Sequence, residues 1–220
     1  MKLKYLFFDF DGVILDSEPI FKRFWIKAVK ENGFTLTEEQ ELTLRSQDHQ
    51  ITTQWFIDTY GPEAKYESIH ASRTRMMGEY LKTHDLPLKK GITDVFEYIK
   101  NNTDLKIYIV SSSSVDYVTL HSKNNHILHY IDKIISVKGV ERGKPFPHAY
   151  LKALEIAGVS KDEVIVFEDS PNGVAAGYNA GLSVAFVEDL SPADEFIKER
   201  SRWQLTSTSQ IIDLLKSLNK

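Results

Sequence analysis

The stretch Phe7-Phe8-Asp9-Phe10-Asp11-Gly12-Val13 joins the end of an apolar segment to two acidic residues. Residues 4–8 are rich in β-forming side chains and are predicted to form a buried strand. Asp9 then falls at the carboxyl end of this strand, where open α/β sheets bind their ligands. The two acids alone are just as typical of a turn or a helix cap, so the rest of the chain must decide between a catalytic site and a turn.

Four more apolar segments of strand length follow along the chain. They lie at residues 107–110, 134–137, 164–167 and 184–187. Helical patterns separate most of them, for example over residues 94–100 and 147–157, and a last helix is predicted after Ser209. This alternation predicts an α/β fold, a Rossmann-like parallel sheet with helices on both faces.

The segment from residue 16 to residue 86 interrupts this alternation with helical periodicity. Its helices are predicted over residues 19–33, 38–44, 52–60 and 66–83. We therefore expect an α/β core formed by residues 1–15 and 87–220, with an inserted helical cap domain formed by residues 16–86. Trp25, Trp55 and Phe56 are expected to pack inside the cap. A domain inserted through two hinges can open and close over a site.

Composition limits the classes of function. The 220 residues, 42% of them hydrophobic, are enough for one large domain or a core with a smaller domain. With 27 basic and 31 acidic residues and no long charge run, a nucleic-acid partner is not expected. No cysteine is present, which excludes disulfides and thiolate chemistry. The absence of an apolar leader predicts a cytoplasmic protein without a membrane partner, and we expect a monomer.

Chemically useful side chains follow other predicted strands. Ser111 and Ser112 come after the second strand, where hydroxyls and backbone N–H groups at a helix start can hold phosphate. Lys144 lies in a loop with prolines at positions 145 and 147, and Glu168 and Asp169 end the fourth strand. Each has an ordinary alternative: a helix cap for the serines, a surface charge for the lysine, and helix-start charges for the acids.

Together these residues predict a phosphate site with a hard cation. Asp9 and Asp169 offer carboxylate oxygens, Ser111 offers a hydroxyl and Lys144 an ammonium group. Mg²⁺ is the expected cofactor, because it favours carboxylates, phosphate and water, and the chain has no thiolate for a softer metal.

The motifs now resemble those of the haloacid dehalogenase (HAD) superfamily over essentially the whole chain. Asp9-Phe10-Asp11-Gly12-Val13 matches its first motif, Ser111 its second, Lys144 in Gly-Lys-Pro its third, and Glu168-Asp169 its fourth. Asp16-Ser17-Glu18 is similar to the β-phosphoglucomutase-like phosphatases of this superfamily. The resemblance implies a HAD-like core with a helical cap and argues against dehalogenation, since dehalogenase members lack the second acid.

The resemblance also implies a mechanism. Asp9 would attack phosphorus and form an aspartyl-phosphate, while Asp11 would protonate the leaving oxygen and later deprotonate water. Mg²⁺ would be held by the Asp9 carboxylate, the Asp11 backbone carbonyl and Asp169. Glu168 would be either a ligand or, as we favour, an acceptor for a metal-bound water.

The remaining motif residues would bind the transferred group. Ser111 and the Ser112 amide would hold a phosphoryl oxygen, and Lys144 would balance charge during transfer. In the cap, Arg45 and His49 are predicted to touch the substrate; a solvated Arg45, or one paired with Glu41, is the alternative.

The expected activity is Mg²⁺-dependent hydrolysis of a small phosphorylated metabolite, such as a sugar phosphate. The alternative is a β-phosphoglucomutase-type mutase, although Phe21, Ser114 and Val115 replace a histidine, a lysine and an asparagine of true mutases. A phosphonate hydrolase would need a cap lysine, and none stands out. A receiver-like signalling module, phosphorylated on Asp9, is the non-enzymatic alternative.

Overall fold

The core is a six-stranded parallel sheet in the order β3-β2-β1-β4-β5-β6. The structure, a computed structural model, describes residues 3–218. Its strands are β1 (Tyr5–Phe8), β2 (Lys106–Ser111), β3 (Lys133–Ser136), β4 (Val164–Glu168), β5 (Ser183–Val187) and β6 (Trp203–Leu205). The five predicted strands and the parallel α/β fold are confirmed, whereas the three-residue strand β6 was not predicted.

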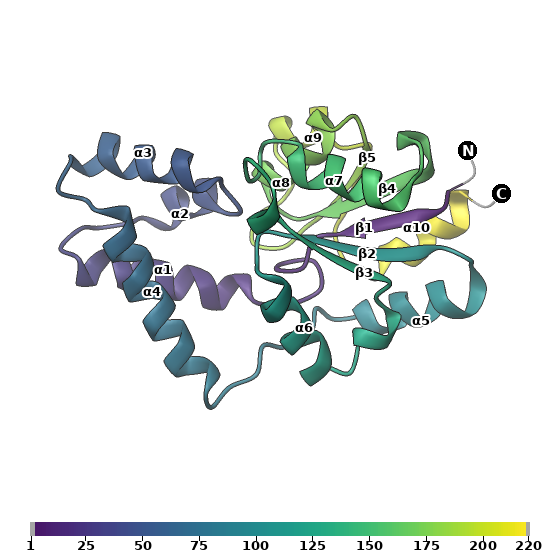
Figure 1. The fold of residues 1–220 in the computed structure, drawn as a ribbon, viewed down its shortest axis with the longest axis horizontal. Helices are drawn as coiled ribbons and strands as arrows, with labels where there is room; N and C mark the ends of the chain where they lie inside the picture. Colours follow the sequence, from purple (N-terminus) through teal and green to yellow (C-terminus); the bar gives the residue numbers. More distant parts are fainter. Residues whose placement is uncertain (1–2, 219–220) are drawn as a thin grey trace.

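Helices cover both faces of this sheet (Figure 1). They are α5 (Ile92–Asn102), α6 (Val115–Asn124), α7 (His148–Ala157), α8 (Pro171–Asn179), α9 (Glu195–Arg200) and α10 (Gln210–Leu218), with 3₁₀ turns η1 (Leu128–Tyr130), η2 (Val137–Gly139) and η3 (Lys161–Glu163). Side chains alternate along a strand, so Leu6 and Phe8 pack with α5, α6 and α10, whereas Phe7 packs with α7, α8 and α9.

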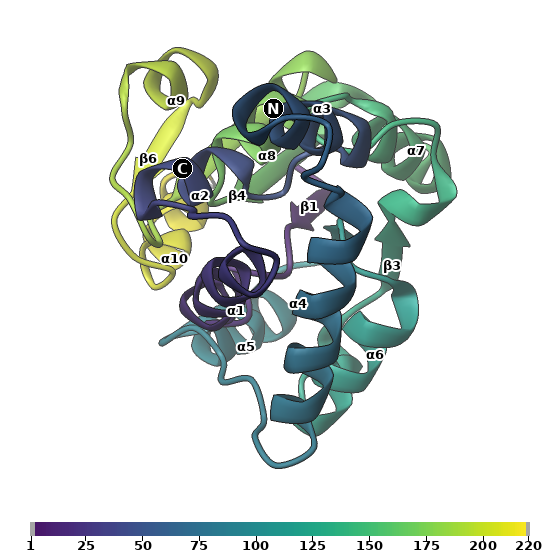
Figure 2. The same ribbon diagram turned by 90° about the vertical axis from the view of Figure 1, so that its left-hand side faces the viewer.

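Four helices form the cap, which lies beyond the carboxyl ends of the strands (Figures 1 and 2). They are α1 (Glu18–Glu31), α2 (Glu38–Leu44), α3 (His49–Tyr60) and α4 (Tyr66–Leu81). Helices α1 and α4 lie side by side, and the cap has its own core around Phe56 and Ile69. Helix α3 begins three residues before the predicted start, because Asp48 caps it by accepting a hydrogen bond from the Gln50 amide.

The two connections between cap and core run side by side. The amide of Asp16 donates to the carbonyl of Pro87 (2.8 Å), and that of Lys89 donates to the carbonyl of Ile14 (2.8 Å). The chain therefore leaves and re-enters the core at one place, as a hinged insertion requires. The domain boundaries at residues 15/16 and 86/87 stay a prediction. Within residues 3–218, no helix is long and apolar enough to cross a membrane.

Candidate functional site

Three adjacent strands bring the predicted residues to one edge of the sheet. Asp9 directly follows β1, Ser111 ends the neighbouring β2, and Glu168 ends β4 on the other side, with Asp169 next in the chain. All four side chains are buried. The parallel register thus gathers side chains that are far apart in sequence at the carboxyl ends of the strands.

Lys144 is buried between two of these carboxylates. Its Nζ lies 2.9 Å from Asp9 Oδ1 and 2.5 Å from Glu168 Oε1. Burial lowers the pKa of Lys144, but the charges of Asp9 and Glu168 outweigh it and leave this pKa above its usual range. The alternative of a solvated surface lysine is therefore wrong, since its side chain is fully buried.

The Glu168 carboxylate has a second partner besides Lys144. The Tyr150 hydroxyl donates to Glu168 Oε1 at 2.5 Å, so this oxygen is shared by Lys144 and Tyr150. Burial, followed by the Asp9 charge, raises the pKa of Glu168. Gly173 at the start of α8 allows this arrangement, because a Cβ there would collide with the Glu168 carboxylate.

Asp11 accepts hydrogen bonds from three hydroxyl groups. The donors are Ser17 Oγ (2.7 Å), Ser113 Oγ (2.8 Å) and Tyr117 OH (3.2 Å). Burial raises the pKa of Asp11 to about 6; the Ser17 hydrogen bond opposes this shift and the Asp9 charge adds to it. A carboxyl group with such a pKa can give and take a proton near neutral pH.

Asp169 connects the core to the cap. Its Oδ2 is ion-paired with the Arg45 guanidinium, which also lies 3.2 Å from Glu18 and 3.3 Å from Asp189. Lys89 completes the group, with Nζ 2.6 Å from Asp189 Oδ1. Arg45 is thus buried among three carboxylates, so the alternative of a solvated arginine is wrong.

The loop after α2 closes onto the core. The amide of Asp48 donates to the Lys144 carbonyl (2.6 Å), and Asp48 Oδ2 accepts from the Gly143 amide (2.8 Å). Arg142 Nη2 pairs with Asp48 Oδ1 (2.9 Å), and Asn172 donates to the Arg45 carbonyl (2.7 Å). These contacts hold the cap against the loops that carry the site.

The donor set fits a hard cation. Asp9, Glu168 and Asp169 offer carboxylate oxygens within 4.8 Å of one another. Glu168 Oε2 and Asp169 Oδ1 are buried without a hydrogen-bond partner among residues 3–218, which leaves them available to an ion. Gly12, at φ 81°, allows the backbone to approach the Asp169 carboxylate closely, because a Cβ there would collide with it. Such buried oxygens suit Mg²⁺.

The serine cluster lies at the start of α6. Ser111 is buried and accepts a hydrogen bond from the Ser113 amide (3.0 Å), while Ser114 caps the helix by accepting from the Tyr117 amide (3.2 Å). Ser112 lines the cavity described next. The cluster therefore includes a helix cap, and its Ser113 hydroxyl also donates to Asp11.

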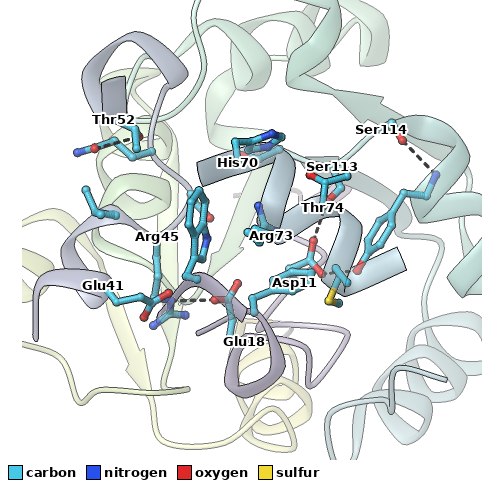
Figure 3. Close-up of a pocket in the computed structure, with 18 of the residues that line it drawn as sticks. Asp11, Glu18, Glu41, Arg45, Thr52, His70, Arg73, Thr74, Ser113 and Ser114 are labelled. Carbon is cyan, nitrogen blue, oxygen red and sulfur yellow. Dashed lines mark hydrogen bonds and ion pairs between the residues drawn. The ribbon is translucent and has the colours of Figure 1, made fainter. Parts of the chain in front are cut away.

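A cavity of about 490 Å³ separates cap and core (Figure 3). Asp11 and residues 112–114 line it from the core, and α1, α2 and α4 line it from the cap. Arg45 lies on its wall. Trp25 also lines the cavity, while it packs against the cap core together with Trp55 and Phe56, as predicted. His49 is not among the lining residues; its exposed side chain pairs with Glu67 at 2.7 Å, because the first turn of α3 points it to solvent.

Several site residues were missed by sequence reasoning. Asp189 follows β5 and could have been found by the strand-end rule that identified Asp169. Tyr117 and Tyr150 lie within helices α6 and α7, where an aromatic side chain is typical of the hydrophobic core. Arg73 lies on α4 and faces the cavity, although the sequence around it is otherwise that of an ordinary helix.

Comparisons with known proteins agree with this geometry. A family model described as haloacid dehalogenase-like hydrolase matches residues 6–187. Hexitol phosphatase A of Escherichia coli is 30% identical over 88% of this chain and 86% of its own length. A phosphorylated carbohydrates phosphatase of Thermotoga maritima is 23% identical over 98% of this chain and 100% of its own length.

One of the similar solved structures comes from Bacteroides vulgatus and is provisionally described as a beta-phosphoglucomutase. It has a TM-score of 0.84 and 25% sequence identity, and the match covers 99% of this chain and 89% of that chain. The likeness therefore extends over both core and cap.

Proposed function

The chain belongs to the haloacid dehalogenase-like hydrolases and is a phosphatase of that family, and on this premise we propose that it hydrolyses a small phosphorylated sugar. The names of relatives that act on hexitol phosphates and phosphorylated carbohydrates support the substrate class. The receiver alternative is not retained, because these relatives are phosphatases. One observation carries the proposal. Asp9 is ion-paired with Lys144, whereas the nearby Asp11 has different partners and accepts a hydrogen bond from Ser17.

The proposed reaction has two displacement steps, which this placement supports. A carboxylate oxygen of Asp9 attacks phosphorus, and the bond from phosphorus to the sugar oxygen breaks as Asp11 gives that oxygen its proton. Water then attacks the aspartyl-phosphate, Asp11 takes the proton of this water, and inorganic phosphate leaves Asp9. The pKa of Asp11, raised to about 6 mainly by burial, supports both roles.

The remaining site residues are proposed to bind the phosphoryl group and to balance its negative charge. Lys144 is proposed to balance the charge of the phosphoryl group while Glu168 and Tyr150 hold its position. Ser111 and the Ser112 amide are the proposed donors to a phosphoryl oxygen. Asp9, Asp169 and the Asp11 carbonyl are the proposed Mg²⁺ ligands. When bound there, Mg²⁺ supplies charge that reduces the repulsion between nucleophile and phosphate.

A mutase is the second candidate, and the likeness to the Bacteroides vulgatus structure favours it. The two activities differ in their products from β-glucose 1-phosphate with a trace of the 1,6-bisphosphate. A phosphatase releases inorganic phosphate, whereas a mutase accumulates glucose 6-phosphate without it. The latter result would replace the proposed activity by the mutase.

The proposed function is tested by ranking sugar phosphates by kcat/KM in the presence of Mg²⁺, beside p-nitrophenyl phosphate. We expect phosphate release from sugar phosphates and its loss in Asp9→Asn. If neither substrate type is hydrolysed, or if Asp9→Asn keeps the wild-type rate, the proposed function is wrong.

A further inference from the structure

Two arginines with different surroundings line the cavity between cap and core: Arg45 is buried and Arg73 is half-buried. The guanidinium of Arg45 is committed, because it is ion-paired with Glu18, Asp169 and Asp189. Arg73 takes part in none of the ion pairs found among residues 3–218, and its Nε is buried without a hydrogen-bond partner there. Arg73 is therefore the arginine of this cavity that is available to a ligand.

Aromatic rings support the Arg73 guanidinium. Its Cζ lies 4.7 Å from the ring centre of Trp25 and 5.1 Å from that of Phe21, both on α1. Stacking of this kind fixes the planar group while its N–H edge stays free for bidentate contacts with an oxyanion. The two rings thus support the Arg73 guanidinium at the wall of the cavity.

Nearby carboxyl groups do not neutralise this cation. Asp11 and Glu18 face the same cavity as Arg73 in Figure 3, but neither lies within ion-pair distance of it. Lys138 of η2 adds a second cation to the cavity wall. Arg73 is half-buried, its Nε is shielded from solvent, and it forms no ion pair among residues 3–218, so an anion should bind here favourably.

The site for the transferred phosphate is a different place. Asp9, Ser111 and Lys144 are buried at the strand ends and are not among the residues that line this cavity. Asp11 and Ser112 mark the boundary between the two places, because they line the cavity from the core. A cavity of about 490 Å³ has room for the rest of a small sugar phosphate, beyond its reacting phosphate.

We propose that Arg73 binds a second acidic group of the substrate, so that the preferred substrates are phosphorylated sugars that carry another oxyanion. This inference rests on the proposed phosphatase function and specifies its substrate class. The shared chemistry is a carboxylate or a second phosphate on the part of the sugar away from the reacting ester. Arg73 is thus a specificity-determining residue of the cap.

The test compares binding of matched ligands to protein that cannot turn them over. In the Asp9→Asn background with Mg²⁺, calorimetry gives the dissociation constants of glucose 6-phosphate, 6-phosphogluconate and glucose 1,6-bisphosphate. The first has no second acidic group, the second adds a carboxylate and the third adds a phosphate. We expect at least one acidic ligand to bind about tenfold more tightly than glucose 6-phosphate, as a charged hydrogen bond provides.

Substitutions test whether the preference for ligands with a second acidic group depends on Arg73. Arg73→Met should reduce the preference to about onefold, and Arg73→Lys should restore part of it. Arg75→Met is the matched control, because Arg75 lies on the same helix but is exposed and pairs with Glu31; it should keep the preference. Melting temperatures of all variants establish that they are folded.

Two results would overturn the inference: equal affinity of the protein with Arg73 intact for all three ligands, or an unchanged preference in Arg73→Met. Failure of the proposed function has a different signature, because it would appear as absence of p-nitrophenyl phosphate hydrolysis by the wild type. The binding measurement tests the role of Arg73 whether or not the wild type hydrolyses p-nitrophenyl phosphate.

Discussion

The guanidinium of Arg45 in the cap is ion-paired with the carboxylate of Asp169 in the core, 124 residues further along the chain. The same carboxylate belongs to the acidic group that fits a hard cation. The cap arginine and a metal ion would therefore share one ligand. Binding of an ion would then depend on whether Arg45 is seated on Asp169.

Replacing Arg45 should alter stability and the response to Mg²⁺ together. Arg45→Met leaves Glu18, Asp169 and Asp189 without their guanidinium, and breaking such a buried pair typically costs about 3–5 kcal/mol. We expect a lower melting temperature, and a larger rise on adding Mg²⁺ than in the wild type. The control Arg75→Met removes an exposed pair and should change neither. An equal Mg²⁺ effect in all three proteins would argue against shared use of Asp169.

Lys144 should be essential for turnover. Lys144→Ala removes the ammonium group between Asp9 and Glu168, and loss of one positioned donor typically reduces kcat by about 10²–10³. The control Lys152→Ala removes a surface lysine of α7 and should leave kcat unchanged. A kcat for Lys144→Ala within a few-fold of wild type, in a protein with a normal melting curve, would contradict this role.

Asp11 should be needed more for the second step than for the first when the leaving group is good. p-Nitrophenolate leaves without a proton, so Asp11→Asn should still phosphorylate Asp9 but lose the base that activates water. Stopped-flow absorbance should show a burst of about one p-nitrophenolate per enzyme, followed by slow turnover. Slow turnover without a burst would mean that Asp11 acts before or during the first step.

Glu41 should make the stability of the protein fall as pH rises. Burial raises its pKa from 4.5 to about 7, so the folded protein binds this proton more tightly than the unfolded chain does. The stabilisation is complete below pH 4.5 and is lost as pH rises toward 7, by on the order of 2–3 kcal/mol. Urea titrations at pH 5 and pH 8 measure this loss.

Glu41→Gln provides the comparison for that measurement. The amide does not titrate, so the difference between the free energies of unfolding at the two pH values should shrink in this variant by the same amount. A difference identical to that of the wild type would show that Glu41 is not the group responsible.

The part of the site that the sequence predicts is the part built by strand ends. Asp9, Ser111 and Asp169 could be found because each follows an apolar run, and parallel strands end at one edge of a sheet. Lys144 could be found only through its motif, since a lysine in a loop has no local sign of burial. The same strand-end rule, applied to β5, would have added Asp189.

Other features depend on contacts between distant segments. The pairing of Arg45 with Asp169, and the lack of an ion pair for Arg73 among residues 3–218, follow from how the cap meets the core, and no local sequence pattern predicts either. His49 was predicted to touch the substrate because it lies near Arg45 in sequence, but its side chain lies outside the cavity lining and pairs with Glu67. Strand β6 was missed because three residues are too few for a periodic signal.

The central claim, that Asp9 is the nucleophile, is tested most directly by trapping its phosphorylated form. Wild-type protein or Asp11→Asn is mixed with Mg²⁺ and substrate, quenched in acid and digested, and the peptide containing Asp9 is analysed by mass spectrometry. We predict one added phosphoryl group on Asp9, with more of it in Asp11→Asn, and none in Asp9→Asn. Substrate turnover in the wild type with no phosphoryl group on this peptide in either protein would contradict the account.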